Sequence, residues 1–433
     1  MLFVSLLLVS LASVNCRIFP EIQDDFEGKN WALIVAGSNG WDNYRHQADV
    51  CHAYQILHRN GIPDKQIVVM MYDDIANNEE NKRPGVIINH PAGDDVYHGV
   101  PKDYNGEDVT PKNFLNILQG KKSAMAGIGS GKVIESGPND NVFVYFTDHG
   151  APGLIAFPSE ELHAKDLITA LNSMYNAKQY AKLVFYLEAC ESGSMFKDLS
   201  STINIYATSA ANGKESSYAC YFDKTLEVYL GDLYSVKWME DSDTENLGKE
   251  SLHKQYKIVR TETNLSHVQE FGDMKMSKCK VGDFQGDEAK PLNPLPFAPL
   301  NAIPSPEVPM AILYHKLEKA SSLEEMQKIR HKIEDMKRLN GNIHKTIETI
   351  VSQSVKSEED ADRIMQAETK DITDWNCYKQ ATTKFSKQCY TLGQHDYAMT
   401  LMGVLVNLCE EPIETSIVLQ TIDKVCKLET NKV

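Results

Sequence analysis

Apolar and polar positions divide the first two thirds of the chain into short apolar runs separated by longer amphipathic segments. Continuous apolar runs are the pattern of strands that are buried on both faces of a sheet. Between them, apolar residues recur at helical spacing, for example at Val50, Cys51, Tyr54 and Leu57. This alternation predicts an α/β fold with a mainly parallel sheet covered by helices. The predicted strands cover residues 31–37, 67–72, 141–146, 183–187 and 203–208.

The segments between the strands differ in character. Residues 38–46 predict a polar loop, and residues 77–110 predict a long surface loop with scattered Gly and Pro. A short helix should begin after Thr110, because the proline that follows suits the first helical position. The stretch 127–132 resembles a phosphate-binding loop, but its spacing is wrong and it precedes a strand, so we interpret it as a turn. Residues 162–174 predict a further helix.

The composition changes after Phe284. Seven of the 17 prolines fall within residues 291–309, which predicts an extended, exposed linker at a domain boundary. Beyond it the pattern is helical, with a capping box at Ser322 and Glu325. The sequence therefore predicts a small helical bundle, whose core positions are Met326, Ile329, Ile333, Met336, Ile343, Ile347, Ile350, Val351, Leu401, Met402, Leu405, Val406 and Leu408.

The first 16 residues form a short apolar run followed by small residues. The run is too short to span a bilayer and fits a secretory signal, although the usual positive charge is missing. The alternative is a buried N-terminal strand. No other window approaches about 18 apolar residues, so we expect a mature protein without a membrane span.

Charge and cysteine content narrow the class of protein. The chain of 433 residues has a net charge of −16, which argues against nucleic acid as a partner, because phosphate binding needs a basic face. Four of the nine cysteines cluster near the C-terminus and suggest two disulfides, with three possible connectivities. The sequon at Asn264 is compatible with a glycosylated surface.

Two predicted strands end in residues that can carry chemistry. His149 follows one, Cys190 follows the next, and the carboxyl ends of parallel strands line the ligand crevice of such folds. A buried cysteine is usually inert, which is our interpretation of Cys51 on its helix face, but polar residues and Gly surround Cys190. A metal site from His149, Cys190 and Glu188 is an alternative, although it lacks short ligand spacing. We therefore expect a Cys–His nucleophile–base pair, no metal and no cofactor.

The pair predicts acyl transfer at a peptide carbonyl. An adjacent imidazole lowers the pKa of a thiol or accepts its proton, and the thiolate then attacks the carbonyl carbon. The backbone N–H groups of Gly150 and Cys190 are candidate oxyanion donors, and one such donor contributes about 3 kcal/mol. Asn43 could orient the imidazole as the third member of a triad.

With these residues assembled, the chain resembles the legumain family of asparaginyl endopeptidases, lysosomal cysteine proteases with a caspase-like fold. The resemblance implies a three-layer α/β/α sandwich followed by an all-α prodomain. The stretches that carry it lie in the same order along the chain: 35–41, 43–49, 146–150, 188–194, 215–220 and 238–243.

The resemblance also implies cleavage after Asn, and weaker cleavage after Asp at acid pH. The matching pocket positions are Arg45, Glu188, Ser216 and Asp232. An amide side chain has an acceptor oxygen and a donor nitrogen, so Arg45 should donate to it while the two carboxylates accept. An Asp substrate would repel these carboxylates unless it is protonated. The alternative for Arg45 and Asp232 is a surface ion pair. Asp148 matches a position that can form a succinimide in the family.

By the same resemblance, the prodomain covers the active site and is released by autocleavage at acid pH. It implies the disulfides Cys377–Cys409 and Cys389–Cys426. The family often cuts after an Asn near the start of this domain, but residues 318–322 contain none, so Asn301 or Asn340 could substitute. Asp24 or Asp25 could serve for N-terminal trimming. The expected division is residues 1–16 signal peptide, 17–25 propeptide, 26–286 catalytic domain, 287–309 linker or activation peptide, and 310–433 inhibitory prodomain.

The leading hypothesis is thus an Asn-specific endopeptidase made as a zymogen in the secretory pathway, active in a lysosome or outside cells. Its expected partners are protein and peptide substrates, its own prodomain and, by resemblance, cystatin-type inhibitors. One alternative is peptide ligation, in which an amine captures the acyl-enzyme in place of water. The other is a non-catalytic binding protein that acts through its helical C-terminal domain.

Overall fold

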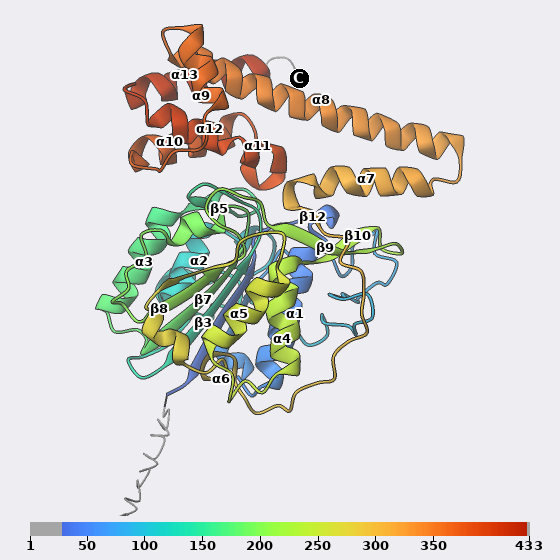
Figure 1. Cartoon of the computed structure of the whole chain (residues 1–433), viewed down its shortest axis with the longest axis vertical. Helices are drawn as coiled ribbons and strands as arrows, with labels where there is room; N and C mark the ends of the chain where they lie inside the picture. Colours follow the sequence, from blue (N-terminus) through green and yellow to red (C-terminus); the bar gives the residue numbers. More distant parts are fainter. Residues whose placement is uncertain (1–27, 431–433) are drawn as a thin grey trace, which may run out of the picture.

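A six-stranded sheet forms the centre of the larger domain (Figure 1). The computed structural model describes residues 28–430, so the expected signal peptide, propeptide and trimming points Asp24 and Asp25 lie outside the described residues. The strand order is β11-β8-β7-β3-β1-β2, and every neighbouring pair is parallel except β11 with β8. The strands are β1 Asn30–Ala36, β2 Ile67–Met70, β3 Asn141–Thr147, β7 Lys182–Glu188, β8 Ile205–Ser209 and β11 Gln269–Gly272.

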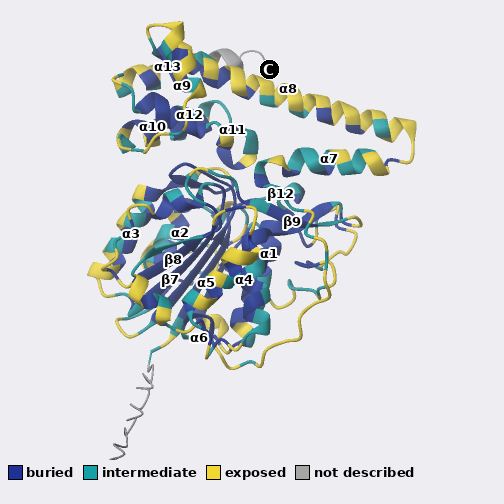
Figure 2. Ribbon diagram, viewed as in Figure 1, coloured by how far each residue is buried: buried dark blue, intermediate teal, exposed yellow. Residues whose placement is uncertain are grey.

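Two apolar layers flank this sheet, as continuous apolar strands require. In β1, Ala32 and Ile34 point into one layer, whereas Leu33 and Val35 point into the other. Both layers are capped by helices, and the sheet is buried in Figure 2. The α/β/α architecture expected from the sequence is therefore confirmed. The helices of this domain are α1 Tyr44–Arg59, α2 Pro111–Leu118, α3 Ala164–Asn176, α4 Leu233–Thr244, α5 Leu252–Glu262 and α6 Gly282–Gln285.

Two smaller sheets lie beside the carboxyl end of the large one. Their strands are short and mix apolar with polar residues, so the apolar pattern did not reveal them. One has the order β4-β5-β6 and the other the order β10-β9-β12. Their strands are β4 Gly150–Ala151, β5 Leu154–Ala156, β6 Glu161–His163, β9 Tyr218–Asp223, β10 Val228–Asp232 and β12 Ile303–Pro304.

The C-terminal domain is helical, as expected. Asp374 caps α10 by accepting from the N–H of Cys377, and Ser322 caps α8 by accepting from that of Glu325. Disulfides join Cys377 to Cys409 and Cys389 to Cys426, the connectivity implied by the resemblance. The helices are α7 Val308–Lys319, α8 Leu323–Ser354, α9 Glu358–Gln366, α10 Trp375–Gln388, α11 Asp396–Thr400, α12 Met402–Cys409 and α13 Thr415–Thr430.

Three expectations from the pattern need correction. Residues 38–46 are not all loop, because α1 begins at Tyr44 and carries the two residues that follow into the core. Residues 77–110 lack regular helices and strands except for a short 3₁₀ turn, but they are not a surface loop throughout, since Ile87, Ile88 and Tyr104 are buried. The linker also ends two residues early, where α7 begins at Val308.

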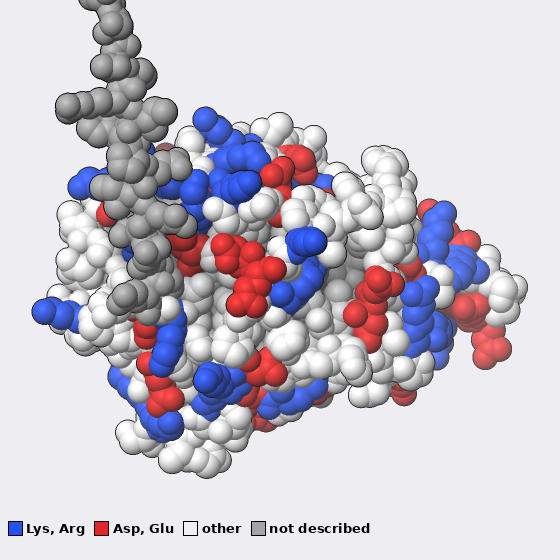
Figure 3. Space-filling view, turned by 90° about the horizontal axis from the view of Figure 1, so that it is seen from below, with Lys and Arg blue, Asp and Glu red and all other residues white. Residues whose placement is uncertain are grey.

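Surface features agree with a chain of mixed charge. On the face seen from below, basic and acidic side chains are interspersed over the part that is visible (Figure 3). Asn264 is exposed in the connection between α5 and β11. Within residues 28–430, no helix combines the length and apolar character needed to cross a bilayer.

Candidate active site

His149 and Cys190 occupy matching positions beyond the ends of two neighbouring strands. In the parallel pair β3 and β7, Thr147 lies opposite Glu188, so each candidate follows its strand by two residues. The N–H of Asp148 still donates to the carbonyl of Glu188 at 3.1 Å, which keeps the two chains side by side beyond the strands. Neighbouring strands are about 4.8 Å apart. The register therefore brings the thiol and the imidazole to one edge of the sheet.

A glycine is required next to His149. A Cβ atom at Gly150 would collide with the carbonyl oxygen of Cys190. The backbone at Gly150 thus lies closer to the backbone of Cys190 than a residue with a side chain would allow.

The imidazole of His149 is held from two domains. Its Nε2 lies 2.9 Å from Oδ1 of Asn43, which sits in a 3₁₀ turn just before α1. The same Nε2 lies 3.3 Å from Oδ1 of Asp396, at the start of α11 in the C-terminal domain. Asn43 was expected from the sequence, whereas Asp396 was not. Both contacts are made to Nε2, so neither of them engages Nδ1.

The thiol of Cys190 lies in a fully covered environment. The N–H of Ser217 donates to its Sγ at 3.4 Å, and the Ser217 hydroxyl lies 3.8 Å from it. Burial raises the pKa of the Cys190 thiol, and the neighbouring Glu191 adds to this. Burial also lowers the pKa of His149. Both shifts favour the neutral thiol and the neutral imidazole while the C-terminal domain is in place.

Arg45 and Asp232 form a buried ion pair, so the alternative of a surface pair is wrong. The Nε atom of Arg45 lies 2.9 Å from Oδ1 of Asp232, and the two side chains are 0% and 1% exposed. Asp49 supports the pair, because its carboxylate accepts from the N–H of Asp232 at 3.2 Å. Desolvation of so many charges is costly unless each is paired. Such a set of buried, paired charges is typical of a site that must recognise a polar group.

Glu188 lies beside this pair at the end of β7. Its Oε2 accepts from the N–H and the hydroxyl of Ser235, at 3.1 and 3.0 Å, whereas its Oε1 is buried without a hydrogen-bond partner among residues 28–430. Burial raises the pKa of Glu188, with the nearby Asp232 as a further cause. Ser216, also expected in the pocket, is half-buried next to Ser217 on the cysteine side.

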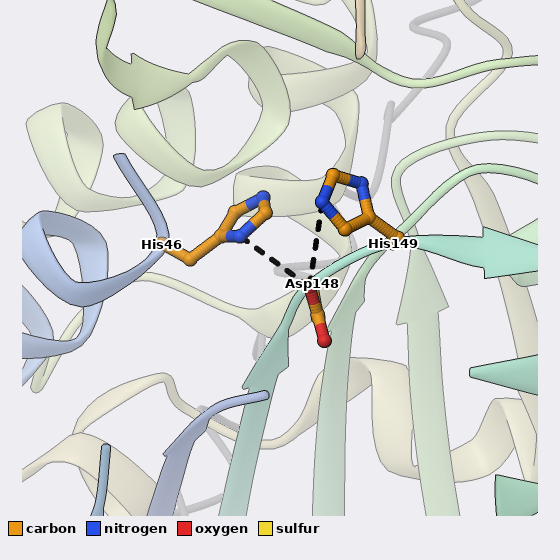
Figure 4. A group of neighbouring side chains, drawn as sticks. All are labelled: His46, Asp148 and His149. Atoms are coloured by element: carbon orange, nitrogen blue, oxygen red, sulfur yellow. Dashed lines mark ion pairs between the residues drawn. The ribbon is translucent and has the colours of Figure 1, made fainter. Parts of the chain in front are cut away.

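His46, Asp148 and His149 form a buried cluster next to the pair (Figure 4). The Nδ1 of His46 lies 2.6 Å from the Ser38 hydroxyl and 3.4 Å from Oδ1 of Asp148. The rings of the two histidines pack edge to face with centroids 5.0 Å apart. Their ligand atoms all lie within 4.8 Å of one another, which divalent metals can accept. The metal alternative with Cys190 and Glu188 does not form such a cluster among the described residues.

The linker that follows the catalytic domain reaches the ion pair of Arg45 and Asp232. Ile303 and Pro304 pair antiparallel with Ala219 and Tyr218 as strand β12. The N–H of Ser305 continues this pairing by donating to the carbonyl of Ser217 at 2.9 Å, and its hydroxyl accepts from Nη2 of Arg45 at 2.7 Å. Ser305 is 1% exposed. Residues 303–305 therefore lie along β9 with one side chain at the guanidinium.

The C-terminal domain covers this edge of the sheet through further contacts. Ala151, Leu154 and Ala156 belong to the same apolar cluster as the bundle core. Interdomain contacts also include a hydrogen bond from the Tyr378 hydroxyl to the carbonyl of Pro152 at 2.6 Å, a contact of His163 Nε2 with the Thr382 hydroxyl at 2.9 Å, and ion pairs of Lys379 with Asp166 and Lys197 with Asp371, both at 2.6 Å.

Comparison with known proteins agrees with this assembly. Residues 30–287 match the Peptidase C13 family, and residues 327–426 match the legumain prodomain. Legumain from Homo sapiens is 52% identical over 404 residues, which cover 92% of this chain and 93% of that protein. Vacuolar-processing enzyme delta-isozyme from Arabidopsis thaliana is 40% identical over 428 residues, covering 93% and 91%. Hemoglobinase from Schistosoma japonicum is 41% identical over 426 residues, covering 97% and 98%.

Among solved structures, caspase-1 from Spodoptera frugiperda covers 57% of this chain and 88% of its own, with 9% identity and a TM-score of 0.34. This likeness is too distant to carry an argument. The family matches and the relatives do carry one, since they span both domains. The chain belongs to the peptidase C13 family, the family of legumain, and is a cysteine endopeptidase with a C-terminal prodomain.

Proposed function

We propose that this endopeptidase cleaves peptide bonds after Asn, and weakly after Asp at acid pH. Cys190 is the nucleophile, His149 the base and Asn43 the residue that orients the base. The observation that carries the proposal is the shared register of β3 and β7, which brings both reactive side chains to one edge, beside a buried Arg45.

The chemistry follows from these positions. The thiol of Cys190 gives its proton to His149, and Sγ attacks the peptide carbonyl. The N–H groups of Gly150 and Cys190 stabilise the oxyanion. The close approach of the Gly150 backbone to the Cys190 carbonyl supports this assignment. The imidazolium then protonates the leaving amine. Water attacks the thioester that remains and releases the acid.

The pocket suits a primary amide. Arg45 donates to the amide oxygen, and the free Oε1 of Glu188 accepts from the amide nitrogen. Asp232 fixes the guanidinium at 2.9 Å. Ser216 precedes Ser217, whose N–H donates to the thiol of Cys190. An Asp side chain must enter protonated to avoid repulsion by Glu188, which explains the acid requirement. Asp148 is buried. The proposal includes the formation of a succinimide at this residue.

We further propose that the chain is a zymogen that activates itself at acid pH. The placement of residues 303–305 along β9 supports this, because a substrate that adds a strand there would present its side chain to Arg45. Ser305 fills that position, but it lacks the amide that the pocket recognises. Pro306 follows Ser305. The nitrogen of the bond between them therefore carries no hydrogen and belongs to a rigid ring.

Of the two candidate cut sites, Asn301 suits cleavage better than Asn340. Asn301 is exposed in the linker, outside any helix or strand, with a φ of 48°. Asn340 lies within the 32-residue helix α8, which would have to unwind to enter an extended substrate track. We therefore assign the first autocleavage to Asn301.

Similarity to the relatives supports a proposal for the compartment and the partners. The likeness to legumain, vacuolar-processing enzyme and hemoglobinase favours an acidic endolysosomal or vacuolar compartment, or secretion into a gut lumen. Protein and peptide substrates fit the site, and inhibitors of the cystatin type would compete for it. Ligation remains an alternative, because an amine can capture the same thioester. A non-catalytic binding role would require the pair to be inert.

Loss of the thiol tests the proposal. The full chain is held at acid pH and then given a fluorogenic peptide with Asn before the bond. Turnover should appear with time and should fall by about 10⁴-fold or more in Cys190→Ala, since the nucleophile is essential. Cys51→Ala is the matched control, because it removes another buried thiol and should remain active. Equal activity in Cys190→Ala would refute the mechanism, and mass spectrometry near neutral pH separates hydrolysis from ligation.

A further inference from the structure

A row of polar side chains runs along one face of α1, which lies beside α4 (Figure 1). Arg45, Asp49, His52 and Arg59 follow one another at spacings of four, three and seven residues, which places them on one side of the helix. The row is about 21 Å long. The exposed fraction of the side chains rises along it, from 0% at Arg45 to 13% at His52 and 29% at Arg59. The row therefore leads from the pocket around Arg45 toward the surface.

Asn89 joins this row to the strand that carries Asp232. Its Nδ2 donates to Oδ1 of Asp49 at 2.7 Å and to the carbonyl of Leu230 at 2.8 Å. Leu230 lies on β10, two residues before Asp232. A Cβ atom at Gly231 would lie 2.9 Å from Nδ2 of Asn89 and 3.1 Å from Oδ1 of Asp49, so the strand runs close to both groups. The side chain of Asn89 thus connects α1 with β10 next to the ion pair.

The backbone that carries Asn89 is itself held on α1. The hydroxyl of Tyr44, the first residue of α1, accepts from the N–H of Ile88 at 2.8 Å and donates to the carbonyl of the same residue at 3.1 Å. Asn89 is buried although it lies outside any helix or strand. Its amide is therefore delivered to a fixed position.

The amide of Asn89 can take only one orientation. A backbone carbonyl cannot donate, so the atom that faces the carbonyl of Leu230 must be the amide nitrogen. Oδ1 then faces Nδ1 of His52 at 2.8 Å and must accept from it. Nε2 of the same ring lies 2.9 Å from Oδ2 of Asp243, which also accepts. Both ring nitrogens therefore carry a hydrogen, and His52 is an imidazolium.

The surroundings of His52 support this charge. Oδ1 of Asp243 accepts from Nη2 of Arg59 at 2.6 Å, so the carboxylate is shared by two cations. Burial alone would raise the pKa of Asp243, but its hydrogen bonds with His52 and Arg59 outweigh burial and lower that pKa. Burial alone would lower the pKa of His52, but Asp243 and Asn89 raise it above 6.5, although Arg59 opposes them. The imidazolium is thus held in place as a donor to Asn89.

These contacts form one continuous series from the surface to the pocket: Arg59, Asp243, His52, Asn89, Asp49 and the backbone N–H of Asp232. We propose that His52 and Asn89 are positioning residues for recognition of the substrate side chain, because they hold Asp49 against Asp232. Asp232 is in turn the partner of Arg45. This inference rests on the proposed function, in which Arg45 binds the Asn side chain of the substrate.

The series acts on recognition and leaves the reacting groups unchanged. Without a donor at His52, the amide of Asn89 loses its fixed orientation, and Asp49 loses a fixed donor. The guanidinium of Arg45 is then held less firmly, whereas Cys190 and His149 keep their own contacts. Discrimination between an amide and a carboxyl group depends on fixed donors and acceptors. The expected defect is a higher KM for an Asn peptide and a lower preference for Asn over Asp, with little change in kcat.

Kinetics of the acid-activated enzyme test the proposal. Asn and Asp peptides are compared at one acid pH, after active sites are counted with an irreversible thiol-directed inhibitor. His52→Leu should lower the Asn-to-Asp ratio of kcat/KM about tenfold, the effect of one hydrogen bond to a charged group. His52→Asn should restore most of the ratio, because its amide nitrogen can replace Nδ1 as the donor. The matched control is His58→Gln, which changes an exposed imidazole on the same helix.

Hydrogen exchange reports the same contact without turnover. In the full Cys190→Ala chain at pH 7, peptides spanning residues 230–236 are followed, because the N–H of Asp232 donates to Asp49. His52→Leu should speed exchange there several-fold, whereas His52→Asn and His58→Gln should not. Unchanged selectivity and exchange in His52→Leu, or equal losses in His52→Leu and His52→Asn, would overturn the inference. A parent enzyme without preference for Asn would refute the proposed function instead, and the exchange rates would still decide whether His52 positions Asp232.

Discussion

Acid should loosen the contact between prodomain and catalytic domain through His163. This side chain is 1% exposed, its Nε2 contacts the Thr382 hydroxyl, and its ring packs edge to face against Tyr378. Burial lowers the pKa of His163 from 6.5 to about 4, while Asp166 raises it slightly and Lys379 lowers it. When the prodomain lifts off, the imidazole regains water and its pKa returns toward 6.5. The docked form thus binds the proton more weakly than the released form.

Linkage gives the sign and the size of the effect of His163 on the docking free energy. Neutral His163 supports docking fully above about pH 6.5, and this support is lost as the pH falls from 6.5 toward 4. One pKa unit corresponds to about 1.4 kcal/mol, so His163 can cost docking about 3 kcal/mol below pH 4. At pH 5 the cost is up to about 2 kcal/mol, or roughly 30-fold in the docking equilibrium. His163→Gln, which cannot take the proton, should remove this cost.

Hydrogen exchange of the interface measures the effect. In a Cys190→Ala background, amides of residues 151–163 and 378–386 are followed from pH 7 to pH 4.5 and corrected for intrinsic rates. The parent should lose protection as the pH falls, and His163→Gln should keep it to a lower pH. His267→Gln is the control, because that imidazole is 75% exposed and pairs with Glu215 within the catalytic domain. If His163→Gln and the parent lose protection at the same pH, the reasoning is wrong.

Three further predictions concern the zymogen. Asp396→Ala should remove the prodomain's contact with the catalytic imidazole and raise the activity of the uncut chain several-fold at pH 6; unchanged turnover of an Asn peptide would contradict this. Ser305→Asn combined with Pro306→Ala should create a cut after residue 305, detected by mass spectrometry, whereas Ser305→Ala with Pro306→Ala should not; the absence of that cut in an otherwise active enzyme would disprove substrate-like binding. Replacing Cys377 and Cys409 by Ser should cost the prodomain about 3–4 kcal/mol in denaturant unfolding, and a loss under about 1 kcal/mol would count against the loop-closure argument.

The apolar pattern predicted the sheet, and with it the positions of His149 and Cys190 beyond the ends of two neighbouring strands, because strands buried on both faces leave continuous apolar runs in the sequence. It could not predict that Arg45 lies buried, since a charged residue near the start of a helix normally faces solvent; only the family resemblance placed it in a pocket. Ser305 and Asp396 were missed for a different reason. Both reach the site through docking of distant segments, and Ser305 is 260 residues from Arg45. No local pattern encodes such a contact.

His46 was within reach of the sequence but was not assigned. It adjoins Arg45 in a stretch where polar residues outnumber apolar ones, although the helical spacing of that stretch continues into the core. A run of polar residues that keeps the period of a buried helix is a signal of a functional site, and here it would have pointed to both residues.

Helix α7 contacts both the catalytic domain and the prodomain helix α8. Val308 and Ile312 anchor α7 in the apolar core of the catalytic domain, while the other side of α7 packs on α8, which runs about 48 Å to the bundle over the active site. A cut before α7, at Asn301, would free helix and bundle together as one body. A cut between α7 and α8, within residues 320–322, would instead let the bundle leave while α7 and Ser305 stay on the enzyme. The position of the first cut thus decides whether α7 and the bundle dissociate together in one step or separately in two.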